Sequence, residues 1–262
     1  MKLMVCLRGE TDQLPFLDEI SKQGAGIELG SFGMIGIKSE RDWRERFRLH
    51  TAVVRQFKGP VALHGPFIGI EYGHIDHLIA SAVSRRLDMT YLVARKLGAF
   101  RVVLHTGFGA ERVLFKIEQD WLERNSAFWK NEIKRWEKAG IGIVLENEIE
   151  KDPDLMIRLA DDVASPFLGL CLDVGHQHLF SSLPLVDWVA KMSRHLRHIH
   201  LHDNDRTADH HWSPGRGTID FEAFFSSVER NAPGATISLE TADLMSVRMK
   251  DLSKLASRFP SE

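Results

Sequence analysis

The chain has 262 residues, of which 44% are hydrophobic and 27% are charged. That length supports one sizeable core, and a formal net charge of -2 gives no sign of a strongly basic, nucleic-acid-binding protein. The apolar stretch at residues 3–7 is too short for a signal peptide or a membrane span. Cys6 and Cys171 both lie in apolar runs, which favours buried reduced thiols, and we therefore expect a cytoplasmic protein.

Short β-rich runs alternate with segments of helical spacing along the chain. We expect eight strands, at residues 2–7, 25–30, 60–65, 101–105, 141–148, 167–173, 198–203 and 236–241. Apolar residues that step by three and four predict helices over residues 79–97 and 115–138. Gly98 and Gly140 then stand where helix C-caps belong.

Eight β-α units over about 250 residues are typical of one (β/α)8 TIM barrel. We therefore predict an α/β protein with a single TIM-barrel domain over residues 1–262. A doubly wound open sheet is the alternative fold, but no glycine-rich dinucleotide fingerprint follows the first strand.

Polar residues mark the carboxyl ends of predicted strands three to eight. They are His64, His105, Glu146, Asp173, His200 and Glu240. In a TIM barrel this end of the strands carries the active site. A ring of carboxylates and imidazoles is electrostatically unfavourable without a cation. The pattern therefore predicts a metal site at the C-terminal end of the strands.

Three further residues extend this set. His176 follows Asp173 by three positions, and Asp209 and His211 lie in the loop before the Gly-Arg-Gly turn. Imidazole together with carboxylate suits zinc, and also manganese. Three other histidines are expected to support the ligands or to lie in solvent, namely His198, His202 and His210.

The ordered motifs LHGP, VLHTG, VLENE, LDVGH, IHLHD, DHH with GRG, and SLET resemble those of one superfamily. It is the endonuclease IV and xylose isomerase-like barrel superfamily, also called AP endonuclease family 2. The resemblance runs from about His64 to Thr241 and implies up to three zinc ions. It implies three ligand sets: His64, His105 and Glu146; Glu146, Asp173, His200 and Glu240; and His176, Asp209 and His211.

Such a multinuclear site favours a hydrolase that cleaves a phosphoester. Clustered zinc ions lower the pKa of bound water to near 7 and clamp a phosphate. We expect Glu146, Glu240 and His176 to be catalytic. The expected substrate-binding residues are Arg206, Arg216 and His202.

The chain also departs from endonuclease IV. Phe67 stands at that family's tyrosine position, His202 replaces an asparagine, and the segment after Glu146 has no Gly-Gln-Gly. These regions belong to the surface that grips abasic DNA, so a nucleic-acid substrate is possible but not favoured. A small phosphorylated or sugar-like compound is the expected partner, and the oligomeric state is left open.

The alternative function is that of a sugar or sugar-phosphate isomerase or epimerase. The resemblance then implies one divalent metal, held by Glu146, Asp173, His200 and Glu240. The two glutamates would shuttle a proton at the carbon beside a metal-polarised carbonyl. A non-catalytic protein on the same barrel is the third possibility, but the ligand set has no gaps.

Overall fold

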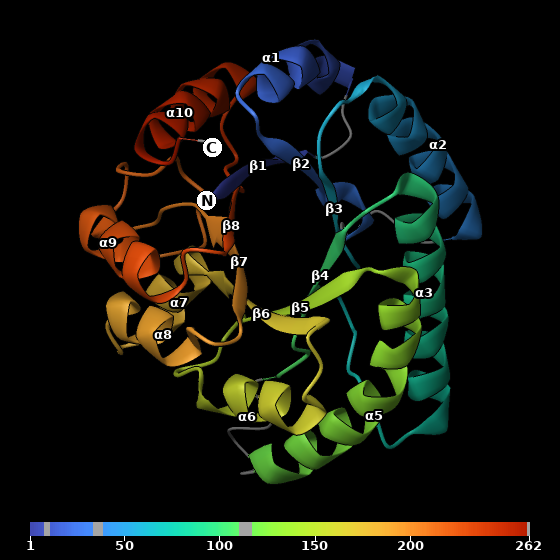
Figure 1. Ribbon diagram of the computed structural model, residues 1–262. Coiled ribbons are helices and arrows are strands. Elements are labelled where there is room, and N and C mark those ends of the chain that lie inside the picture. The colour runs from blue at the N-terminus through green and yellow to red at the C-terminus, as the bar shows by residue number, and fades with distance from the viewer. Residues whose placement is uncertain (8–10, 34–38, 110–116, 261–262) are drawn as a thin grey trace.

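The computed structural model describes residues 1–7, 11–33, 39–109 and 117–260. Eight parallel strands close into a barrel in chain order, and β1 pairs with β8 to complete it (Figure 1). The strands are β1 (Lys2–Leu7), β2 (Gly26–Leu29), β3 (Val61–His64), β4 (Arg101–His105), β5 (Gly142–Glu146), β6 (Leu168–Asp173), β7 (Leu196–Leu201) and β8 (Thr236–Leu239). The predicted TIM-barrel fold is therefore confirmed.

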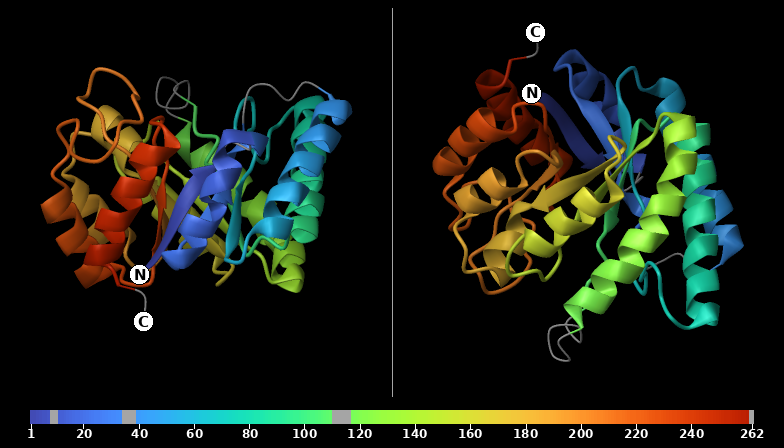
Figure 2. Two further views of the ribbon diagram at one scale, coloured as in Figure 1. Left: turned by 90° about the horizontal axis from the view of Figure 1, so that it is seen from above. Right: turned by 60° about the horizontal axis from the view of Figure 1, so that its bottom comes forward.

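Helices surround the barrel on its outside (Figure 2). They are α1 (Leu17–Lys22), α2 (Glu40–Gln56), α3 (His77–Leu97), α5 (Glu118–Ala139), α6 (Asp154–Val163), α7 (Val174–Phe180), α8 (Leu185–Met192), α9 (Phe221–Asn231) and α10 (Met245–Arg258). Two 3-10 helices, Thr11–Phe16 and Gly30–Phe32, follow β1 and β2. No helix in the described ranges is long and apolar enough to cross a membrane.

The eight predicted strands agree with the structure in number and order and differ at their ends. Gly98 and Gly140 cap α3 and α5 with φ angles of 65° and 68°, a left-handed conformation that glycine adopts without strain. Residues 115–116 of the second predicted helix lie outside the described ranges. The sequence predicts the seventh strand over residues 198–203, but this strand begins at Leu196 and ends at Leu201. It ends early because Asp203 pairs with Trp212 in an isolated antiparallel bridge.

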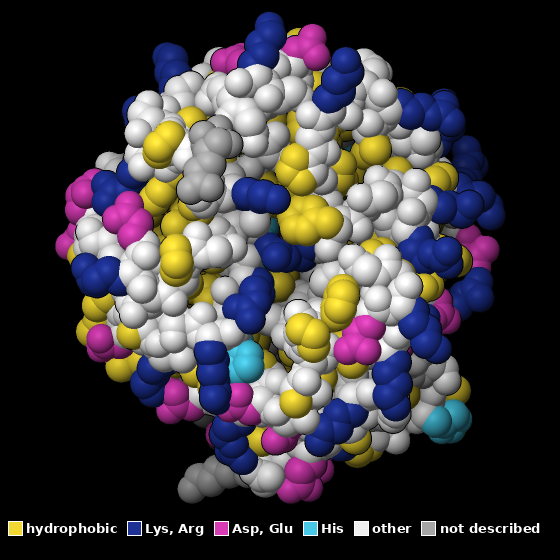
Figure 3. All heavy atoms as spheres, viewed as in Figure 1, with side chains coloured by type: hydrophobic (Ala, Val, Ile, Leu, Met, Phe, Trp, Pro, Cys, Tyr) yellow, Lys and Arg dark blue, Asp and Glu magenta, His cyan; other side chains and the backbone are white. Residues whose placement is uncertain are grey.

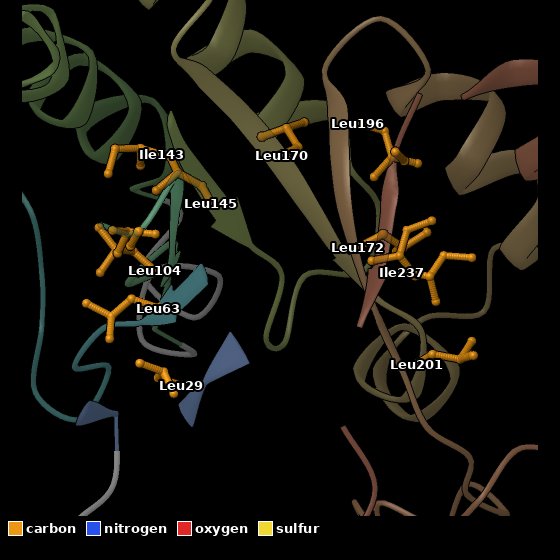
Figure 4. Close-up of a cluster of buried hydrophobic side chains, with 14 of the residues drawn as sticks. Leu29, Leu63, Leu104, Ile143, Leu145, Leu170, Leu172, Leu196, Leu201 and Ile237 are labelled. Atoms are coloured by element: carbon orange, nitrogen blue, oxygen red, sulfur yellow. The ribbon is translucent and has the colours of Figure 1, made fainter. Parts of the chain in front are cut away.

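Side chains alternate along each strand between the helix layer and the barrel interior. The helix-facing residues are apolar and form most of the core, as Figure 4 shows for leucines and isoleucines of several strands. Val103, Val144 and Cys171 form a small separate apolar cluster in the interior. Cys171 and Cys6 are buried, free thiols, as the sequence predicts.

The two ends of the barrel differ in chemistry. The N-terminus and the C-terminal end of α10 lie at the end where the strands begin (Figure 2). Lys and Arg side chains lie around the centre of this face (Figure 3). The polar residues at the strand carboxyl ends lie at the opposite end of the barrel.

The apolar contacts between strands and helices should dominate stability. We expect Leu104→Ala to lower the free energy of unfolding by about 2–5 kcal/mol, because Leu104 is completely buried on β4. Leu92→Ala on α3 should change it by less than about 0.5 kcal/mol, because Leu92 is exposed. Urea unfolding followed by circular dichroism measures the free energy of unfolding of both variants. Equal losses would contradict the claim that buried contacts between strands and helices dominate stability.

Candidate metal centre

The side chains of Glu146, Asp173, His200 and Glu240 converge from β5, β6 and β7 and from the residue that follows β8. Glu146 Oε1 and Glu240 Oε2 lie 3.0 and 2.9 Å from Nδ1 of His200. Asp173 Oδ2 lies 3.8 Å from the same nitrogen. One donor atom from each of the four residues lies within 4.8 Å of the others. Three carboxylates thus lie within 3.8 Å of one ring nitrogen of the buried His200.

Two histidines approach Glu146 from β3 and β4. Glu146 Oε2 lies 3.2 Å from Nε2 of His64 and 3.5 Å from Nε2 of His105. The grouping differs in part from the expected ligand set, because donors of His64, Glu146 and His200 form the compact trio. Nδ1 of His105 lies instead 2.9 Å from Glu148, a residue that the sequence analysis did not single out.

A third group lies beside the first two. Asp209 Oδ2 is 2.9 Å from Nε2 of His211 and 3.4 Å from Nε2 of His176. One donor of each residue lies within 4.8 Å of the others, as the third predicted set requires. The neighbouring His210 turns away and stacks on Trp212.

Asp203 fixes the loop that carries Asp209 and His211. Its Oδ2 accepts hydrogen bonds from the backbone N–H groups of Gly215 at 2.9 Å and Gly217 at 2.7 Å. A Cβ atom at Gly217 would lie 2.2 Å from the Asn204 carbonyl oxygen, so only glycine fits there. The Gly-Arg-Gly turn therefore shapes the loop.

Backbone carbonyls orient three of the imidazoles. Nδ1–H of His64 donates to Gly65 at 2.8 Å, and Nδ1–H of His176 donates to Asn147 at 2.9 Å. Nδ1–H of His211 donates to the carbonyl of Glu240 at 2.7 Å. Each of these bonds leaves Nε2 facing the cluster, as in metal-ligating histidines.

Mutual charge effects dominate the titration of the cluster. Burial lowers the pKa of His64, but the hydrogen bond and charge of Glu146 outweigh it and raise this pKa to about 9. Burial also lowers the pKa of His211, which Asp209 and Glu240 raise to about 9. Burial raises the pKa of the Glu240 carboxyl, but the charge of His200 lowers it to about 2. The Glu240 carboxylate therefore stays charged, and His64 and His211 bind protons that a cation could replace.

Sequence reasoning missed Glu28, which β2 places inside the barrel. Its carboxylate is completely buried and bonds to Nε2 of His198 at 2.8 Å and Nε2 of His200 at 3.0 Å. Burial raises the pKa of Glu28, but His200 and His198 hold it well below its usual value. The only sequence signal was an acidic residue between Ile27 and Leu29 in an otherwise apolar strand.

The three predicted substrate-binding residues lie outside the cavity above the cluster. His202 is completely buried, with Nε2 3.0 Å from both carboxylate oxygens of Asp173. Arg206 is exposed, and Arg216 lies over the Trp212 ring, 3.6 Å from an oxygen of Asp243. Their role in substrate binding stays a prediction.

A cavity of about 310 Å³ opens onto the cluster. Its lining is His64, Phe67, His105, Glu146, Glu148, Ile149, His176, Phe180, Asp209, His211 and Glu240. A second cavity of about 560 Å³ adjoins it and shares Phe67, Glu148 and Ile149. Phe67, at the position where endonuclease IV has tyrosine, stacks on His105 with ring centroids 4.6 Å apart.

Comparison with known protein families agrees with this architecture. The family described as xylose isomerase-like TIM barrel matches residues 30–256. The chain belongs to this family. Among curated proteins, the uncharacterized protein MJ1614 of Methanocaldococcus jannaschii is 25% identical over 224 residues, which are 84% of this chain and 82% of that protein.

Solved structures share the fold over nearly the whole chain. A D-tagatose 3-epimerase-like protein has a TM-score of 0.77 at 20% identity and covers 99% of this chain and 98% of its own. The TTHB071 protein of Thermus thermophilus, soaked with ZnCl2, has a TM-score of 0.76 at 22% identity. The match covers 98% of this chain and 99% of that protein. At these identities the likeness shows the fold alone.

The raised pKa of His64 makes the stability of the metal-free protein depend on pH. Because this pKa is about 9 in the folded state, against about 6.5 when unfolded, its ion pair with Glu146 stabilises the fold fully below pH 6.5. This stabilisation is lost as the pH rises through 9. In the presence of a chelator, His64→Gln should therefore destabilise the protein more at pH 6.5 than at pH 9.5. Urea titrations at both values measure this; an equal or larger loss at pH 9.5 would contradict it.

Proposed function

We propose that the protein is a metal-dependent sugar or sugar-phosphate isomerase or epimerase. The observation that carries the proposal is the convergence of Glu146, Asp173, His200 and Glu240, with both glutamates lining the cavity. Proteins with this fold include a D-tagatose 3-epimerase-like protein, L-ribulose 3-epimerase and D-psicose 3-epimerase. These names favour sugar chemistry over the phosphoester hydrolysis that the sequence analysis put first.

The donor set fits a divalent cation. Donor atoms of three carboxylates and one imidazole lie close together, and such mixed oxygen and nitrogen donors suit zinc or manganese. The IolI structure with a bound zinc atom has the same fold, with a TM-score of 0.73 at 16% identity. In our proposal Glu146, Asp173, His200 and Glu240 hold one cation of this kind.

A divalent cation held by these four residues would supply Lewis-acid chemistry: it would polarise a substrate carbonyl and make the neighbouring C–H bond more acidic. One of the two carboxylates, Glu146 or Glu240, removes the proton from that carbon, and the electron pair of the C–H bond moves toward the carbonyl oxygen. The other carboxyl group, which enters this step protonated, returns its proton to the opposite face of the same carbon for epimerisation. For isomerisation a proton is returned to the former carbonyl carbon, while the hydroxyl proton of the first carbon moves to the former carbonyl oxygen. His200 contacts both carboxylates and positions them for this exchange.

The two adjoining cavities suit a small substrate. The first cavity holds the reacting carbons against the glutamates, and Phe67, Ile149 and Phe180 give it apolar walls that limit access of water. The second cavity, which is mainly lined by apolar side chains, leaves room for the rest of the molecule. This arrangement supports a substrate of monosaccharide size or slightly larger.

Phosphoester hydrolysis at a multinuclear zinc site is the second candidate function. The group of His176, Asp209 and His211 favours it, because a one-metal isomerase gives these residues no compulsory ligand role. The two functions differ in the number of metal ions that activity requires.

Loss of one proton-transferring carboxylate should abolish activity. We expect Glu240→Gln to lower kcat for sugar epimerisation by roughly a hundred- to ten-thousand-fold, the usual effect of removing a general acid or base. Asp209→Asn should leave kcat nearly unchanged, because a one-metal site does not need Asp209. Chromatography of the epimer products measures both variants; equal losses would contradict the one-metal mechanism.

Removal of the metal should abolish activity reversibly. After dialysis against a chelator, a single equivalent of zinc or manganese per chain should restore full epimerase activity. Elemental mass spectrometry alongside the activity titration gives the stoichiometry. A requirement for two or three equivalents would favour the multinuclear hydrolase instead.

A further inference from the structure

We propose that Glu28 is a positioning residue that sets His200 for cation binding. It does so as part of a buried polar chain that runs along the barrel interior toward the candidate metal centre. This inference rests on the proposed function in one respect: it takes His200 to be a ligand of the catalytic cation.

This series of hydrogen-bonded polar side chains starts on β4. The guanidinium of Arg101 donates a hydrogen bond to Oγ1 of Thr236 at 2.7 Å, and Thr236 in turn contacts Nδ1 of His198. Arginine has no acceptor, so the Thr236 hydroxyl hydrogen stays free to donate. Its other acceptor, the carbonyl oxygen of Arg197, lies farther away at 3.3 Å. Donation to His198 leaves the ring hydrogen of that histidine on Nε2.

Glu28 receives this hydrogen and a second one. Its Oε2 accepts from Nε2–H of His198 at 2.8 Å, and its Oε1 accepts from Nε2–H of His200 at 3.0 Å. A charged carboxylate can only accept, so His200 must place a hydrogen on Nε2. In the neutral ring Nδ1 then carries a lone pair, and this is the nitrogen that faces Glu146 and Glu240.

His200 differs in this respect from the other three oriented histidines. Backbone carbonyls hold Nδ1 of His64, His176 and His211 and leave Nε2 toward the cluster. His200 presents the opposite nitrogen, and a side-chain carboxylate from another strand holds it. A carboxylate behind a metal-ligating imidazole fixes the ring and increases its basicity, so its loss weakens metal binding.

Zinc affinity without any sugar tests the role of Glu28. We expect Glu28→Gln, which keeps the shape but removes the charge, to weaken zinc binding by about 10- to 100-fold in competition with a chelating dye. Glu132→Gln is the matched control, because it makes the same change at a partly buried carboxylate. Glu132 lies on α5 in the helix layer, where it bonds to Arg135 and Trp136 and not to the cluster. This control should bind zinc as the unaltered protein does. A folded Glu28→Gln variant with unaltered zinc affinity would overturn the inference.

A second measurement decides the matter if Glu28→Gln does not fold. In the unaltered, zinc-loaded protein labelled with 15N-histidine, long-range 1H–15N spectra report which ring nitrogen of His200 carries hydrogen. The inference requires hydrogen on Nε2 and the metal on Nδ1; hydrogen on Nδ1 would refute it. A His200→Asn variant assigns the signals.

These experiments separate this inference from the proposed function. If no sugar is turned over but Glu28→Gln still weakens zinc binding, the proposed function fails and the role of Glu28 stands. If sugars are epimerised but Glu28→Gln binds zinc as the unaltered protein does, the proposed function stands and the positioning role of Glu28 fails.

Discussion

The packing of three carboxylates around one imidazole is the constraint on which the site depends. Glu146, Asp173 and Glu240 stand next to His200 because four parallel strands of a closed barrel end at the same level. Repulsion among buried carboxylates is costly, and a divalent cation is the neutralising partner whose ligand preferences match these donors. The barrel therefore holds the three carboxylates close together, and binding of a metal would reduce the repulsion between them.

The fold tolerates this polar interior because its stability comes from elsewhere. The strands bury apolar side chains against the surrounding helices, and that interface forms the main core. Inside the barrel and at its loop end, buried carboxylates have partners: Glu28 bonds to two histidines, and Asp203 binds the backbone of the Gly-Arg-Gly turn. Buried charges are acceptable only when they are paired in this way.

Much of the fold, and the proximity of the residues that form the candidate site, could be predicted from the sequence for a physical reason. Alternating β and α patterns give the barrel, and parallel strands that end together bring residues as distant as His64 and Glu146 into contact. Glu28 could not be found in this way, because it lies inside its strand and its partners are about 170 residues away. Loop residues such as Arg216 were equally difficult, since their direction depends on local turns and not on strand periodicity.

Exchange of hydrogen with solvent tests the central claim most directly. The metal-loaded protein would be incubated in D2O with a panel of ketoses and ketose phosphates, and the sugars analysed by mass spectrometry and NMR. Our account predicts incorporation of deuterium at the carbon beside the carbonyl of at least one sugar. No incorporation in any of them, together with release of phosphate from simple phosphoesters, would contradict it.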